Sequence, residues 1–71
     1  MRFDATGFLT TEIGSVHYVR VLFQQHGIEI ADATVRKWYD RNAIPGDWLA
    51  QLLVLLEAER GAPVSLFRYF L

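Results

Sequence analysis

Cysteine is absent from this 71-residue chain, so it has neither a disulfide framework nor a thiolate metal site. Long apolar runs are missing as well. The longest purely aliphatic stretch, residues 52 to 56, is far too short to span a membrane. No apolar run follows the first residues, MRFD, which argues against a secretory signal. These absences predict a soluble cytoplasmic protein.

An excess of positive charge is also lacking. Seven Lys and Arg residues stand against eight Asp and Glu residues, for a formal net charge of −1. A strongly basic domain would be the plainest sign of a nucleic-acid partner, so the overall charge weighs mildly against one. A basic face is still available to the chain, because Lys37 and Arg41 lie one helical turn apart.

Signals of catalysis and metal binding are missing. The chain has no phosphate-binding glycine loop, no H-E-x-x-H motif and no nucleophile elbow. Glu57 and Glu59 lie two residues apart in a predicted helix and so point to different faces, which does not suit an acid/base pair. His17 and His26 have no third ligand at metal-binding spacing. We therefore expect no enzyme activity, no cofactor and no metal.

Hydrophobic residues, by contrast, are plentiful. They make up 52% of the chain, and 14% of all residues are aromatic, which is enough for a dense core and argues against disorder. A chain of this length forms a single domain, residues 1 to 71. The apolar spacing predicts a mostly α, compact domain of about three helices, with short terminal strands left open.

The first expected helix begins at Thr10, Thr11 or Ser15 and ends at Gly27, which suits the left-handed C-terminal position. Residues 1 to 10 form either an arm or an edge strand.

The second expected helix is capped by Asp32 and runs to about Arg41 or Asn42. Pro45 lies in the first turn of the third helix, and Gly61 closes it.

The segment ATVRKWYDRNAIPGDW, residues 33 to 48, is the most informative part of the chain. A helix there buries Val35 and Trp38 and turns Arg36 and Lys37 to solvent. The small residues at its start would allow close approach to a grooved surface. This layout is typical of a helix that enters a DNA groove, and it also suits an ordinary surface helix.

Four residues fall on the apolar positions of phage Cro/repressor-type helix-turn-helix proteins: Ile28, Ile30, Val35 and Trp38. The following NAIPGDW resembles the segment that leads such domains from the recognition helix into the next core helix. The chain resembles this family over about residues 16 to 60, which implies a small phage-type or prophage-type regulator.

The region between the first two helices departs from the family pattern. The places where the family usually has a small residue and a turn glycine hold Gln25 and Glu29, and Gly27 lies two residues early. The link is therefore expected to be longer than the family turn. The first ten residues leave little room for the family's leading helix.

The resemblance implies a recognition helix at about residues 32 to 42, in the major groove of double-stranded DNA. Asp32, in a base-facing position, would be repelled by phosphates, so we interpret it as the helix cap. Arg36 would contact guanine, and Lys37 would contact guanine or phosphate. Arg41, Tyr39 and the backbone at the start of the third helix would touch phosphates. The DNA-binding residues expected by position are Ala33, Thr34, Arg36, Lys37, Tyr39 and Arg41.

The apolar surplus of a short chain predicts a homodimer. Its expected interface comprises Leu52, Leu55, Leu56, Phe67, Tyr69 and Phe70. The apolar tail, residues 62 to 71, should be buried, either as a strand paired with residues 1 to 5 or as a short helix capped by Ser65.

Two functions follow from this pattern. The first is a sequence-specific DNA-binding transcriptional regulator, a repressor of the phage type. The alternative is a protein-interaction module, such as a phage-encoded adaptor or inhibitor, that docks residues 48 to 56 and the aromatic tail onto a host or phage protein. Neutralisation of the cationic face by Asp32 and Asp40 would favour the second function.

Overall fold

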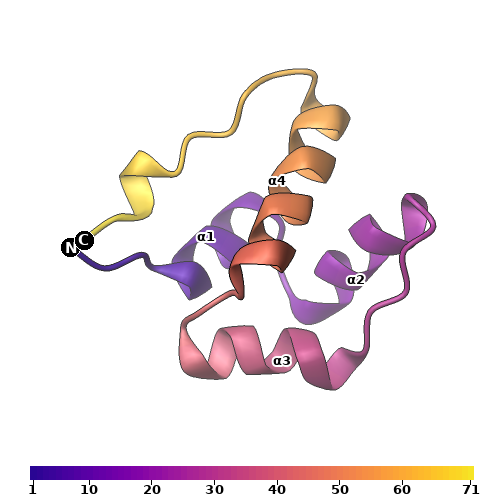
Figure 1. Cartoon of the computed structure of the whole chain (residues 1–71), viewed down its shortest axis with the longest axis horizontal. Helices are drawn as coiled ribbons and strands as arrows, with labels where there is room; N and C mark the ends of the chain where they lie inside the picture. The colour runs from indigo at the N-terminus through magenta and orange to yellow at the C-terminus, as the bar shows by residue number, and fades with distance from the viewer.

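The computed structural model describes all 71 residues. The elements are α1 (Ala5–Glu12), α2 (Val16–Gln25), α3 (Asp32–Arg41), α4 (Gly46–Arg60) and the short 3₁₀ helix η1 (Phe67–Tyr69). The predicted mostly α class is confirmed, with four α-helices instead of about three. In Figure 1, α3 runs beneath the other helices and the two chain ends meet at one side.

Helix α1 occupies residues 5 to 12, so the prediction of an arm or edge strand over residues 1 to 10, with little room for a leading helix, is wrong from residue 5 onward. Asp4 caps α1 by accepting a hydrogen bond from the Gly7 N–H at 3.1 Å. Ala5, Phe8 and Leu9 are fully buried. Their spacing places them on one side of a helix, and their burial holds α1 on the core.

A break at residues 13 to 15 separates α1 from α2. Gly14 has φ +132°, a conformation that side-chain-bearing residues rarely adopt. Ser15, one of the predicted starts, occupies the N-cap position of α2. The other predicted starts, Thr10 and Thr11, lie inside α1 and begin no helix.

The ends of the later helices follow the predicted signals. Gly27, just after α2, has φ +74°, and Gly61, just after α4, has φ +66°. Asn42 ends α3 in the left-handed conformation, with φ +52°. Pro45, which was expected in the first turn of α4, lies one residue before that helix, at its N-cap. Gly27, Gly61 and Asn42 end their helices because glycine and asparagine tolerate positive φ. Pro45 favours the start of α4 because its fixed φ suits the beginning of a helix.

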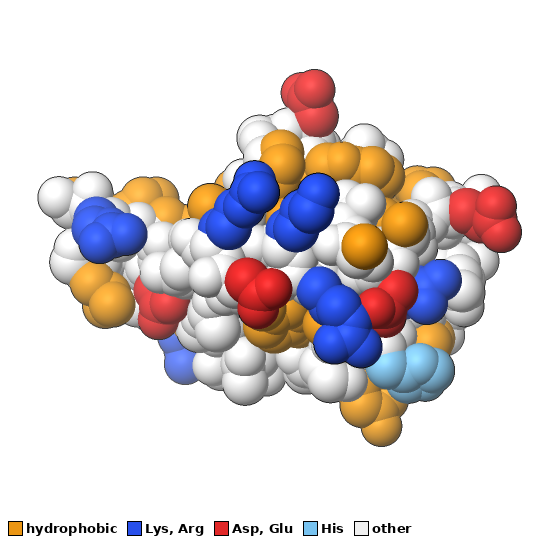
Figure 2. Space-filling view, turned by 90° about the horizontal axis from the view of Figure 1, so that it is seen from below, with side chains coloured by type: hydrophobic (Ala, Val, Ile, Leu, Met, Phe, Trp, Pro, Cys, Tyr) orange, Lys and Arg blue, Asp and Glu red, His pale blue; other side chains and the backbone are white.

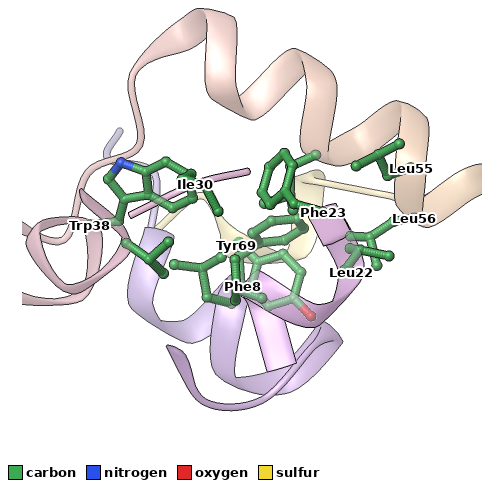
Figure 3. Packing of buried hydrophobic residues seen from close by; sticks show 12 residues of the cluster. Phe8, Leu22, Phe23, Ile30, Trp38, Leu55, Leu56 and Tyr69 are labelled. Atoms are coloured by element: carbon green, nitrogen blue, oxygen red, sulfur yellow. The ribbon is translucent and has the colours of Figure 1, made fainter. Parts of the chain in front are cut away.

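The core is one hydrophobic cluster to which every helix contributes. Trp38 is only 2% exposed, and its ring lies 6.4 Å from that of Phe23 and 5.9 Å from that of Trp48. Phe23 and Trp48 meet edge to face at 5.5 Å. Figure 3 shows Phe8 and Tyr69 close together in the same cluster, where their rings also pack edge to face. Such aromatic pairs stabilise a small core beyond their area alone.

The C-terminal tail returns to the N-terminus. Phe3 and Phe70 form an isolated antiparallel bridge, which is all that exists of the predicted terminal strands. The tail also contains η1, with Leu66 at its N-cap instead of the expected Ser65. Both predicted alternatives are therefore present in part, but the prediction that the tail is buried is wrong, because most of its residues are exposed and Tyr69 alone is buried.

Most of the predicted dimer residues are used inside the chain. Four are buried in its own core: Leu52, Leu55, Leu56 and Tyr69. They pack in one cluster with residues of α1 and α2, so the prediction that they form a dimer surface is wrong. Phe67 and Phe70 remain exposed, at 82% and 41%.

Glu12 fixes the tail and the end of α4 to α1. Its carboxylate accepts hydrogen bonds from the Tyr69 hydroxyl and from Nη1 of Arg60, the latter at 2.5 Å. Nη2 of Arg60 also donates to the Glu12 carbonyl at 2.9 Å. The bond from Tyr69 lowers the pKa of Glu12. Burial, followed by the same bond, raises the pKa of Tyr69.

Stability should therefore fall at both ends of the pH range. Because the pKa of Glu12 is lowered by folding, its contribution is present above the ordinary value of 4.5 and is lost as the pH falls through the folded value. Because the pKa of Tyr69 is raised, its contribution is present below 10.0 and is lost as the pH rises through the folded value.

Tyr69→Phe should lower the free energy of unfolding by about 1.5–3 kcal/mol at neutral pH, because it removes a hydrogen bond to a charged group. It should also flatten the loss of stability on acidification, measured by urea unfolding at a series of pH values. Tyr18→Phe is the matched control, since the Tyr18 side chain is largely exposed. An acid profile identical to that of the original protein would contradict this role of Glu12.

Trp38→Ala should cost about 3–5 kcal/mol of stability, because it empties the centre of the aromatic cluster. Phe67→Ala should change stability by no more than about 0.5 kcal/mol, because that ring lies in solvent. Thermal unfolding followed by circular dichroism compares the two. An unchanged melting temperature for Trp38→Ala would contradict the packing described above.

Candidate nucleic-acid interface

Helix α3 turns the predicted cationic residues to solvent. Burial of Val35 and Trp38 fixes the rotation of the helix about its axis. The exposed positions lie on the opposite side: Ala33, Arg36, Lys37, Asp40 and Arg41. Figure 2, which views the molecule from below, shows Lys and Arg side chains interleaved with Asp and Glu side chains on this face. Thr34 is half-buried beside it.

Asp32 binds two arginines instead of capping α3, so the cap prediction is wrong. The N-cap is Ala31, whose carbonyl accepts from the Thr34 N–H at 3.1 Å. As the first helical residue, Asp32 lies one turn before Arg36, and its Oδ2 accepts a hydrogen bond from Nε of that arginine. Its Oδ1 lies 3.8 Å from Nη1 of Arg20 on α2. Hydrogen bonding and charge from Asp32 raise the pKa of Arg36.

Lys37 and Arg41 form no ion pair with any carboxylate. With Thr34, Trp38 and residues 43 to 45, they line a hollow of about 340 Å³. Trp38 and the apolar side chains of the loop supply its uncharged wall. The two cations are therefore free to neutralise an anion beside an apolar surface.

The hollow adjoins the start of α4, where backbone N–H groups lack helical partners and carry partial positive charge. Asp47 in this first turn offsets part of that charge. On the opposite border, Glu29 lies beside Arg20. Asp40, which is exposed on the same side of α3 and forms no ion pair, offsets part of the positive charge of the face, and the unpaired cations that remain are Lys37 and Arg41.

Tyr39, which was predicted to touch a phosphate, is engaged inside the fold. Its hydroxyl donates to the Gly14 carbonyl at 2.6 Å, and its own carbonyl accepts from the Thr6 hydroxyl at 3.0 Å. Burial raises the pKa of Tyr39. These contacts hold α3 against α1 and against the break that follows α1, so the hydroxyl is already engaged.

Asn42 and Arg20 make contacts that no sequence pattern predicted. Oδ1 of Asn42 accepts from the Thr6 N–H at 2.8 Å, so this residue ends α3 and also satisfies a free donor in the first turn of α1. Nε of Arg20 donates to the Ile30 carbonyl at 3.0 Å and so fixes the link before α3. That link spans residues 26 to 31, and the expectation of a longer connection is confirmed.

Tyr39→Phe should lower the free energy of unfolding by about 0.5–1.5 kcal/mol, the contribution of one neutral hydrogen bond. Its affinity for a DNA duplex should stay unchanged at a temperature where the variant is fully folded. Fluorescence anisotropy and urea unfolding give the two quantities. A loss of affinity with no loss of stability would restore the phosphate role to this tyrosine.

No protein-family model matches the chain, and no curated protein or solved structure matches it. No helix has both the length and the apolar character needed to cross a membrane. No three His, Asp or Glu side chains come together as a metal site requires. The resemblance to phage Cro/repressor-type proteins therefore depends on the sequence pattern of residues 16 to 60.

Proposed function

We propose that this protein binds double-stranded DNA as a sequence-specific transcriptional regulator, with the exposed face of α3 in the major groove. The observation that carries this proposal is the rotation of α3. Its apolar side enters the core, while Arg36, Lys37 and Arg41 share the opposite side. A helix with a buried back and a cationic front fits a groove about 12 Å wide.

The three cations have different surroundings, which supports different roles. Arg36 has the planar donor set that pairs with O6 and N7 of guanine, so we assign it to base contact. Lys37 and Arg41 lie beside the start of α4, so we assign them to phosphates, together with the free N–H groups of that turn. The small side chains of Ala33 and Thr34 allow the first turn of α3 to approach the groove.

A homodimer is part of the same proposal. Two copies on a near-palindromic site would place their α3 helices about 34–36 Å apart, one turn of DNA. Of the predicted interface, only Phe67 and Phe70 remain available at the surface.

The second candidate function is a protein-interaction module. The observation that favours it is the exposure of apolar side chains on α4 and the termini, among them Val54, Phe67 and Leu71. The attachment of Arg36 to Asp32 also favours it, because one cation of the α3 face is already compensated. A phage-encoded adaptor or inhibitor would present these apolar side chains to its target.

Replacing Lys37 and Arg41 together by Gln should weaken binding to a mixed-sequence duplex and reduce the slope of log affinity against log salt by about two. The matched control replaces Arg2 and Arg68 by Gln. These residues belong to the terminal segments and also form no ion pair. Fluorescence anisotropy at several salt concentrations measures both effects.

Equal losses in the two double variants would mean that only total charge matters. Absence of binding by the original protein at low salt would contradict the DNA proposal and favour the interaction module.

A further inference from the structure

Asp32 lies between two arginines that come from different helices. Arg36 follows it by one turn on α3 and donates from Nε to Oδ2, while Oδ1 faces Nη1 of Arg20 at 3.8 Å. Arg20 is held in place, because its own Nε donates to the Ile30 carbonyl at 3.0 Å. Asp32 therefore has an anchored partner on α2 and a second partner on α3 that nothing else in the chain holds.

The exposure of these side chains allows Arg36 to leave. Its side chain is 65% exposed, against 43% for Asp32 and 36% for Arg20. Ion pairs this exposed stabilise a protein little, so separating Arg36 from Asp32 is easy. After Arg36 departs, the Asp32 carboxylate still has the Arg20 guanidinium as a neighbour. Its negative charge also stays at the start of α3, where it is favourable to the helix dipole.

We infer that Asp32 makes Arg36 selective for guanine over phosphate, an inference that rests on the proposed DNA-binding function. A phosphate is an anion that must replace Asp32 as the partner of Arg36 while the carboxylate repels it at close range. A guanine edge is neutral and offers two acceptors to the guanidinium. Asp32 therefore lowers sequence-independent binding through Arg36 more than it lowers binding to a guanine in the correct position.

Asp40 provides the matched comparison. It lies on the same exposed side of α3, one turn after Arg36, but it forms no ion pair. Asp32→Asn and Asp40→Asn remove the same charge from the same helix. Only Asp32→Asn removes the carboxylate to which Arg36 is bound.

The experiment measures binding of both variants to a mixed-sequence duplex of about 20 base pairs, alone and combined with Arg36→Ala. Asp32→Asn should bind about two- to fivefold more tightly than Asp40→Asn, the range expected for release from an exposed ion pair. The salt slope should also become steeper by about one. Both differences should vanish in the presence of Arg36→Ala.

Selectivity provides a second readout. A duplex enriched by the original protein from a randomised pool should lose part of its advantage over the mixed-sequence duplex when Asp32→Asn is tested. Melting temperatures confirm folding, and Asp32→Ser replaces Asp32→Asn if the latter is unfolded.

Equal gains by Asp32→Asn and Asp40→Asn, or a gain that survives Arg36→Ala, would overturn the inference and leave DNA binding intact. Absence of binding by the original protein and all variants at low salt would overturn the DNA-binding function itself.

Discussion

Burial of one side of α3 is the constraint on which the rest of the structure depends. Val35 and Trp38 enter the core, and Trp38 meets Phe23 and Trp48 in a three-ring cluster. Side chains on a helix keep fixed angular relations, so burying these two determines what the opposite side presents. The packing that stabilises the domain therefore also places the cations of α3 on the side that is open to a partner.

Polar contacts between distant residues complete the frame around this helix. Tyr39 reaches Gly14 at the break after α1, and Asn42 binds the backbone of Thr6 in the first turn of that helix. Both ends of α1 are therefore tied to the second half of α3. These partners lie 25 and 36 residues apart in the sequence, so no local pattern identifies them. The same is true of Arg20 on α2, whose guanidinium lies near the carboxylate of Asp32 on α3. The exposed face of α3 was predictable from periodicity, whereas the contacts that compensate or occupy its side chains were not.

Local signals predicted the later helices and failed for the first. Gly27 and Gly61 adopt the expected left-handed conformations. This position after a helix favours glycine through its backbone conformation alone, so no tertiary contact is needed to predict it. Helix α1 was missed because the apolar residues at positions 3 and 5 alternate as in a strand, and because Gly7 is a poor helix former. The predicted dimer surface on α4 was wrong for a related reason. The apolar residues of α4 that were expected to meet a second copy are covered instead by α1, α2 and the returning tail.

A titration of the isotope-labelled chain with a mixed-sequence DNA duplex, followed by amide chemical shifts at low and then higher salt, tests the central claim most directly. The account predicts shifts at the exposed positions of residues 32 to 41 and in the first turn of α4, fading as salt is added because phosphate contacts release counterions. Absence of shifts at low salt, or shifts confined to the exposed side of α4 and the tail, would contradict DNA binding by α3.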